Sequence, residues 1–136
     1  MKKIILLDNQ SSENVFSNPT LVTNIRNVSR TLRLTTNAGI LETSTMATVP
    51  EYGDVWFSEE AITNIFSLAK MSEKHRVTFD SARNDCFTVH LPQRKAKFEK
   101  TLNNLYVFRP KIYRGEESTV GNRAWTKRQC HLTTVG

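Results

Sequence analysis

The chain has few cysteines and few glycines, and each shortage excludes a class of protein. It contains only Cys86 and Cys130 among 136 residues, which is too few for a disulfide scaffold and suits a reducing compartment. A structural zinc site needs about four Cys or His ligands at workable spacings, which these cysteines and the nearby histidines do not supply. The five glycines are scattered, so a phosphate-binding glycine-rich loop is excluded. We therefore expect no metal and no other cofactor.

Long hydrophobic runs are also missing. The apolar run Ile4–Leu7 stops at Asp8 after four residues, short of the roughly 7–15 residues of a secretory signal. No stretch approaches the roughly 20 apolar residues of a membrane helix. We expect an intracellular chain, in the cytoplasm, with no membrane contact.

Charge is distributed unevenly along the chain. Residues 1–90 carry 9 basic and 10 acidic side chains, whereas residues 91–136 carry 10 and 3. The length favours a single domain, which we place at residues 1–92, followed by a basic linker at 93–136. Phe98, Tyr106 and Trp125 stand among the basic residues, so weak nucleic-acid binding by this extension is an alternative to a solvated linker.

Alternating and β-branched segments predict a mostly antiparallel β domain. The first hairpin has Asn37, Ala38 and Gly39 at its turn, because these residues tolerate positive φ or tight turns. A second hairpin joins two further runs across a polar turn. The predicted strands span residues 3–7, 31–35, 40–45, 52–57, 76–80, 86–90 and 105–108. Chains of this size and type close as sandwiches or barrels.

Other segments give weaker signals. Residues 12–30 are rich in Ser and Asn and contain Pro19, so we expect a long connection. Ser58, followed by two glutamates, predicts the start of a short helix, with Ile62, Ile65, Phe66 and Ala69 at helical spacing. A short strand through Asn64–Leu68 is the alternative. Residues 126–129 fit a helix capping box.

Asp8 is the main candidate for chemistry, because it directly follows an apolar strand and begins a polar turn. The simpler interpretation is structural, since Asp favours turns by bonding its own backbone. Acid–base hydrolysis of an amide instead needs two close carboxylates that share a proton. The strand-plus-Asp pattern does not recur, and Asp80 is its nearest approximation. A twofold homodimer would bring the second Asp8 to the same axis.

These residues resemble a known family. Ile4–Ser12, with Asp8-Asn9-Gln10-Ser11, is similar to the start of the retropepsin-like aspartic protease in copia-type retrotransposon (Gag-Pol) polyproteins. Further similar segments cover nearly the whole chain: Leu32–Gly39 resembles the flap, Ala61–Leu68 the Asn-Leu/Ile-Leu-Ser segment, and Thr126–Gln129 the start of the segment before the integrase. The other matching segments are Tyr52–Phe57, Arg76–Ser81 and Phe87–His90.

The resemblance implies a small closed β-barrel with one short helix and a basic C-terminal extension, which homodimerises and is truncated before the integrase. Asp8 from each chain would be catalytic, with support from Asn9, Gln10 and Ser11. Flaps at Asn37, Ala38 and Gly39 would close over an extended peptide substrate, which binds as an added strand.

The family's usual motif has Ser or Thr and then Gly after the catalytic Asp, whereas this chain has Asn9 and Gln10. A glycine allows the backbone to turn tightly beside the carboxylate. The sequence therefore leaves open whether the domain is an active endopeptidase, a catalytically inactive retrotransposon remnant or a basic nucleic-acid-binding fragment.

Overall fold

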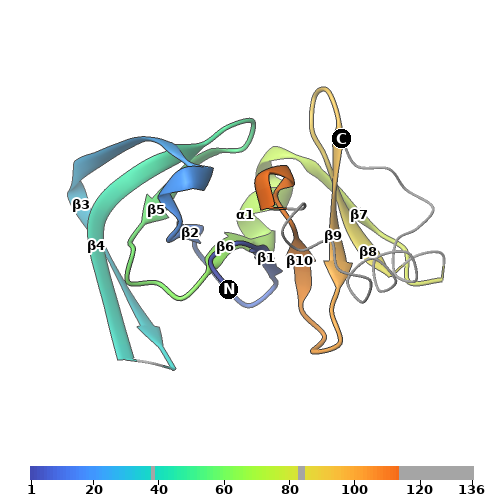
Figure 1. The fold of residues 1–136 in the computed structure, drawn as a ribbon, viewed down its shortest axis with the longest axis horizontal. Helices are drawn as coiled ribbons and strands as arrows, with labels where there is room; N and C mark the ends of the chain where they lie inside the picture. The colour runs from blue at the N-terminus through green and yellow to red at the C-terminus, as the bar shows by residue number, and fades with distance from the viewer. Residues whose placement is uncertain (38, 83–84, 114–136) are drawn as a thin grey trace.

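A computed structural model describes residues 1–37, 39–82 and 85–113. Within these ranges the strands form one mixed sheet of ten strands (Figure 1), in the order β3-β4-β5-β2-β6-β1-β10-β9-β8-β7. The strands are β1 (Ile5–Asp8), β2 (Val15–Phe16), β3 (Thr23–Thr36), β4 (Gly39–Val49), β5 (Gly53–Phe57), β6 (Asn64–Ser67), β7 (Arg76–Phe79), β8 (Cys86–His90), β9 (Lys95–Lys100) and β10 (Tyr106–Phe108). The helical elements in these ranges are the 3₁₀ helix η1 (Pro19–Leu21) and α1 (Leu68–Lys74), and residues 111–113 are helical as well. The all-β prediction is confirmed.

The prediction of a closed barrel is wrong. The sheet is open, because β3 and β7 are its two edges and the described residues contain no pairing between them. Figure 1 shows the sheet extending from the long β3–β4 hairpin on one side to the β7–β8 hairpin on the other. Alternating side chains predict strands but not their spatial order, so the sequence could not reveal where the edges lie.

β1 lies near the middle of the sheet. It runs parallel to β6 and antiparallel to β10. Ile5 and Leu7 are buried on one face, as expected for a short apolar strand covered by other elements. Parallel neighbours need a long crossover connection, and here the chain between β1 and β6 includes the whole β3–β4 hairpin.

The long connection predicted at residues 12–30 is wrong, because this stretch contains β2, η1 and the first half of β3. Phe16 is fully buried, whereas the first half of β3 is mostly exposed. An exposed strand does not need apolar residues at alternate positions, so β3 lacked the pattern on which its prediction would depend.

The helix predicted from Ser58 is also wrong, and the alternative strand is confirmed as β6. Ser58 Oγ accepts a hydrogen bond from the Glu60 backbone N–H at 3.2 Å, which forms a local turn. The helix begins later, at Leu68, where Ser67 is the N-cap and its side chain accepts from the Lys70 N–H. Periodicity alone does not separate a short buried strand from a helix.

The basic run that was expected to open the linker forms β9. Ala96 and Phe98 are fully buried against the core, and β9 pairs with both β8 and β10. The sheet therefore continues to Phe108, beyond the domain boundary expected after residue 92. The predicted capping box at residues 126–129 lies outside the described residues.

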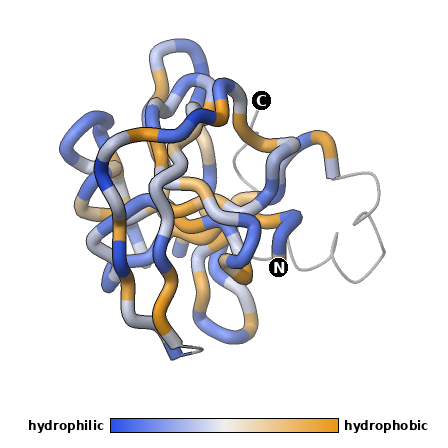
Figure 2. The backbone as a smooth tube through the Cα atoms, turned by 90° about the vertical axis from the view of Figure 1, so that its left-hand side faces the viewer, coloured by the Kyte–Doolittle hydropathy of each residue, from blue (hydrophilic) through white to orange (hydrophobic). Residues whose placement is uncertain are grey.

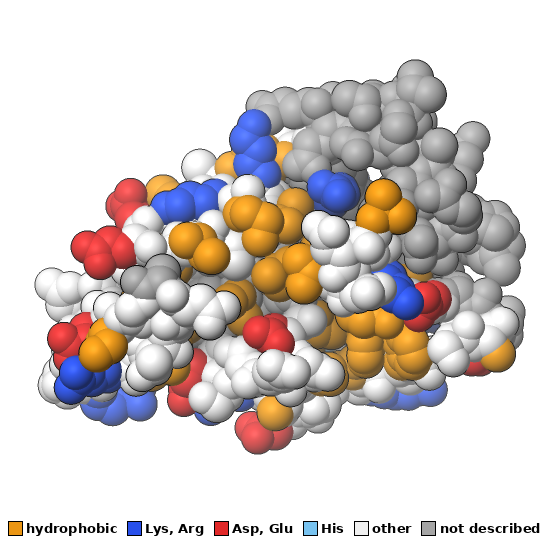
Figure 3. All heavy atoms as spheres, turned by 90° about the horizontal axis from the view of Figure 1, so that it is seen from below, with side chains coloured by type: hydrophobic (Ala, Val, Ile, Leu, Met, Phe, Trp, Pro, Cys, Tyr) orange, Lys and Arg blue, Asp and Glu red, His pale blue; other side chains and the backbone are white. Residues whose placement is uncertain are grey.

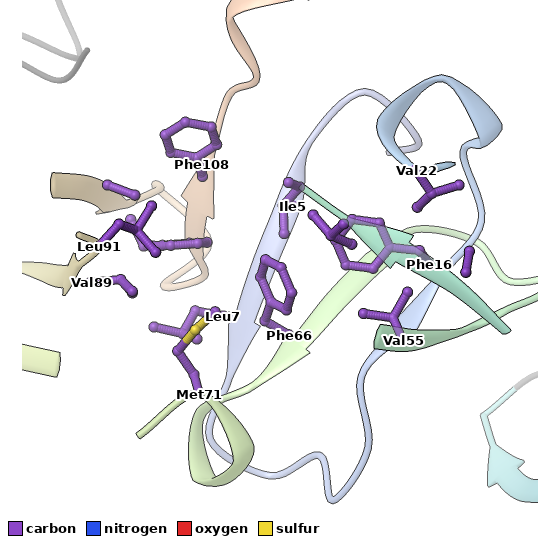
Figure 4. Packing of buried hydrophobic residues seen from close by; sticks show 14 of the residues in the cluster. Ile5, Leu7, Phe16, Val22, Val55, Phe66, Met71, Val89, Leu91 and Phe108 are labelled. Atoms are coloured by element: carbon purple, nitrogen blue, oxygen red, sulfur yellow. The ribbon is translucent and has the colours of Figure 1, made fainter. Parts of the chain in front are cut away.

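Apolar side chains from most strands form one core cluster. Figure 2 shows hydrophobic segments gathered towards the middle of the fold. Ile5, Phe16 and Phe66 lie together at the centre of the packing (Figure 4), and the rings of Phe16 and Phe66 are 4.9 Å apart. No helix among the described residues is long and apolar enough to cross a membrane.

A buried amide side chain connects several backbone segments within this interior. Asn64 is fully buried, and its Nδ2 donates to the carbonyl oxygens of Lys2 and Ile4 at 2.8 and 2.9 Å. Its Oδ1 accepts from the backbone N–H groups of Ser17 and Asn18. Cys86 is buried, and Cys130 lies outside the described residues.

Candidate functional site

Asp8 is the last residue of β1, at the point where the chain leaves the sheet. The preceding Leu7 is buried in the core, whereas Asp8 itself is half-buried. In the parallel pairing of β1 with β6, Asp8 lies opposite Ser67, which is the N-cap of α1. The loop after Asp8 is connected to this helix by an ion pair between Glu13 and Lys70, with Nζ 3.9 Å from Oε1.

The Asp8 carboxylate is held by its own loop. Its Oδ1 accepts a hydrogen bond of 2.8 Å from the Gln10 backbone N–H. Asp80 makes the same contact with the Ala82 N–H at 3.0 Å. This bond is therefore an ordinary turn interaction, and it fixes the carboxylate without by itself making it catalytic.

The three residues after Asp8 have different positions. Asn9 and Gln10 are exposed. Ser11 is half-buried, and its hydroxyl donates to the Glu13 carbonyl oxygen at 2.8 Å. Ser11 thus shapes the loop by closing its second turn, as Ser commonly does.

A cavity of about 580 Å³ lies beside Asp8. Figure 3 shows hydrophobic side chains gathered around hollows on the face of the molecule seen from below. The cavity is lined by Leu6, Leu7, Asp8, Asn9, Gln10, Leu68, Phe79, Phe87, Asn104, Leu105 and Tyr106. A mostly apolar cavity with a few polar groups is typical of a binding site.

Three aromatic side chains form one wall of this cavity. The Phe87 ring lies 4.6 Å from that of Phe79 and 4.8 Å from that of Tyr106, and the Tyr106 contact is perpendicular. Such tilted and edge-to-face contacts hold aromatic rings in defined positions. The Tyr106 hydroxyl donates to Asp85 at 3.3 Å. Burial, together with the Asp85 carboxylate, raises the pKa of Tyr106 above its usual range.

Asp8 is the only acidic residue that lines the cavity among the described residues. The same residues contain no group of three or more His, Cys, Asp or Glu side chains that could hold a metal ion. A second carboxylate in this cavity would therefore have to come from another chain or from outside the described residues.

The residues predicted as a flap lie at the β3–β4 hairpin, away from the lining of the cavity beside Asp8. Asn37 and Gly39 flank the turn of the β3–β4 hairpin, and Thr36 Oγ1 donates to the Gly39 carbonyl at 2.9 Å. Gly39 has a φ of +122°, which glycine adopts without strain. Ala38 lies outside the described residues. No described residue of this turn lines the cavity beside Asp8.

Sequence reasoning missed most of the cavity wall. Phe79 and Phe87 were assigned to strands, but the order of β10, β9, β8 and β7 beside β1 was not predicted. Their alternation with Thr78 and Thr88 indicated that they share one sheet face. No sequence signal placed that face next to Asp8.

Comparison of the chain with protein-family models, with curated proteins and with solved structures found no match.

Proposed function

We propose that this domain is an aspartic-type endopeptidase of the retropepsin-like kind, active as a homodimer. The observation that carries the proposal is the Asp8 carboxylate, which is fixed at the end of a buried strand and lines an apolar cavity of about 580 Å³. The sequence resemblance supports the same assignment.

The chemistry requires two Asp8 carboxylates at a twofold axis. Two close carboxylates cannot both ionise readily, so they share one proton. The charged member removes a proton from a water molecule that attacks the peptide carbonyl carbon. The protonated member polarises the carbonyl oxygen and later supplies a proton to the leaving nitrogen. A single copy supplies only one of these groups from the described residues.

The aromatic wall supports a peptide as the substrate. Phe79 is 42% exposed and Leu105 is 40% exposed, although both are large and apolar. Covering them with an apolar side chain of a peptide would remove their surface from water, at roughly 25 cal/mol per Å². The peptide backbone would remain available for strand-like hydrogen bonds.

The test is cleavage of an unfolded protein substrate, such as reduced casein, at mildly acidic pH by wild type, Asp8→Asn and Asp80→Asn. Asparagine keeps a side-chain oxygen that accepts the turn hydrogen bond, so both variants should fold. We expect activity in wild type and Asp80→Asn and none in Asp8→Asn. Cleavage that survives Asp8→Asn would refute the proposal. Absence of cleavage by a folded wild-type dimer would instead favour an inactive remnant.

A further inference from the structure

One face of β7, β8 and β9 carries four basic side chains in two neighbouring rows. Strand register places Arg76 opposite His90 and His90 opposite Lys95. The next row on the same face consists of Thr78, Thr88 and Lys97. Residues opposite each other in adjacent strands point to the same side of the sheet. We name Arg76, His90, Lys95 and Lys97 the basic face.

The opposite side of these strands confirms this orientation. Val89, Ala96 and Phe98 alternate with the residues of the basic face, and all three are fully buried in the core. Figure 1 shows β7, β8 and β9 side by side at one end of the sheet. The basic face therefore lies on the side of these strands opposite to Val89, Ala96 and Phe98. Its first row is accessible, whereas Thr88 and Lys97 in its second row are buried.

Carboxylate partners are absent from these cations among the described residues. The ion pairs of the described residues involve other cations, namely Arg26, Arg33, Lys70, Arg94 and Lys100. Glu99 lies on the same face, two residues beyond Lys97, opposite Cys86, and marks the end of the basic rows. Like charges directly opposite each other in a sheet are destabilising, so this arrangement has an energetic cost in the free protein.

Lys97 is the most unusual member. Its side chain is only 7% exposed, and its ammonium donates to a neutral group, the Thr88 hydroxyl, at 2.9 Å. A buried charge is normally paired with an opposite charge. Burial and then the Lys95 charge lower the pKa of the Lys97 ammonium. A lysine ammonium has three N–H donors, so two of them have no acceptor among the described residues.

We infer that the basic face is a binding surface for the phosphate backbone of single-stranded nucleic acid. Phosphate oxygens accept hydrogen bonds from Lys, Arg and hydroxyl side chains, which are the groups present here. Arg76 and Lys95 are exposed and His90 is half-buried, so a backbone lying across the strands would meet these groups first. The net charge of +6 adds a general attraction for polyanions. This surface is separate from the Asp8 cavity and does not depend on the proposed protease activity.

The test is fluorescence anisotropy with a labelled oligothymidylate of about 20 nucleotides and the full chain. The variant is Arg76→Gln/Lys95→Gln, in which both substituted residues are exposed. The matched control is Arg33→Gln/Lys74→Gln, which changes the net charge equally but lies on β3 and α1. We expect the first variant to bind about tenfold more weakly than the control. Circular dichroism and thermal unfolding of both variants establish that they are folded.

Salt dependence gives a second readout. Single strands release counterions with a slope of about −0.7 per phosphate contact in a plot of log affinity against log salt concentration. The Arg76→Gln/Lys95→Gln variant should lose about 1.4 of this slope relative to the control. Equal affinities and equal slopes for the two variants would overturn the inference and assign binding to other basic residues. No binding by the wild type would overturn it as well, as would equally tight binding of polyglutamate.

Discussion

Asp8 and Ser67 are direct neighbours in the parallel pairing of β1 with β6. The catalytic candidate and the N-cap residue of α1 therefore lie at the same end of two adjacent strands. Ser67 N–H donates to Asn14 Oδ1 at 2.7 Å, which connects the loop after Asp8 to the start of the helix. The position of the Asp8 loop consequently depends on β6, and β6 depends on Asn64.

Replacement of Asn64 should strongly destabilise the domain. Asn64→Asp removes the Nδ2 group that donates hydrogen bonds to the carbonyl oxygens of Lys2 and Ile4. It also places a carboxylate beside these two oxygens. Leaving each buried group unsatisfied costs about 1–3 kcal/mol, and more where a charge is involved. We expect the free energy of unfolding to fall by at least about 3 kcal/mol.

Urea denaturation measures this change, with the exposed Asn103→Asp as the control. The Asn103 backbone, rather than its side chain, makes the local turn contact with Thr101, so the control should change stability by less than about 0.5 kcal/mol. Equal stabilities of the two variants would show that the Asn64 hydrogen bonds do not hold the N-terminal segment.

The free energy of unfolding of the domain should depend on pH through His90. Burial, followed by the charges of Arg76, Lys95 and Lys97, lowers the pKa of His90, and the Thr78 hydroxyl contacts its Nε2 at 2.9 Å. The folded state therefore binds the proton more weakly than the unfolded state, in which the pKa is about 6.5. The free energy of unfolding should fall as the pH drops below about 6.5.

His90→Gln isolates this effect because glutamine does not titrate and is still able to bond Thr78. Denaturation of wild type and variant from about pH 7.5 to about pH 5.5 gives the comparison. Wild type should lose stability more steeply than His90→Gln over this range. Parallel curves would mean that protonation of His90 does not oppose folding.

Tyr52 should remain a neutral phenol to unusually high pH. Burial raises the pKa of Tyr52 to about 12, against the opposing effect of the nearby Arg94 guanidinium. Because the unfolded phenol ionises near pH 10, folding should weaken as the pH rises above about 10. Ultraviolet titration of tyrosinate, compared with Tyr52→Phe, should reveal one phenol that ionises late. Below about pH 11, wild type and Tyr52→Phe should ionise the same number of phenols. The additional phenol of the wild type should ionise only above this pH. Ionisation of that phenol near pH 10 would contradict the prediction.

The aromatic wall should influence substrate binding more than turnover. Phe87→Ala removes the ring that contacts both Phe79 and Tyr106, so the proposed apolar contact with the substrate would be reduced. We expect KM for an apolar peptide to rise about tenfold, with a smaller change in kcat. Ile62→Ala, at an exposed position outside the cavity, provides the control. An unchanged KM in Phe87→Ala would remove the aromatic wall from the substrate site.

The sequence was informative where one face of a strand is buried. β1 followed from its short apolar run, whereas the β3–β4 turn and the β7–β8 hairpin followed from alternation and turn residues. It failed where burial did not produce that pattern, as in the exposed first half of β3. It failed again in β9, where Lys97 is buried between Ala96 and Phe98, so that the run looked like a charged linker.

The candidate site was only partly predictable for a related reason. Asp8 was recognisable because it follows its own strand directly. Phe79, Phe87 and Leu105 reach the same cavity only because β10 and β9 lie between β1 and β8. That order depends on long-range packing, which no local pattern in the sequence encodes.

The most direct test of the proposed function is a subunit-mixing experiment. Wild type and Asp8→Asn are mixed in equal amounts, unfolded and refolded together, and cleavage is compared with the same total amount of wild type. If each active site needs Asp8 from both chains, only about a quarter of the dimers are active, and the activity falls to about a quarter. Activity of about half would contradict the account, because each wild-type chain would then act without the Asp8 of a partner.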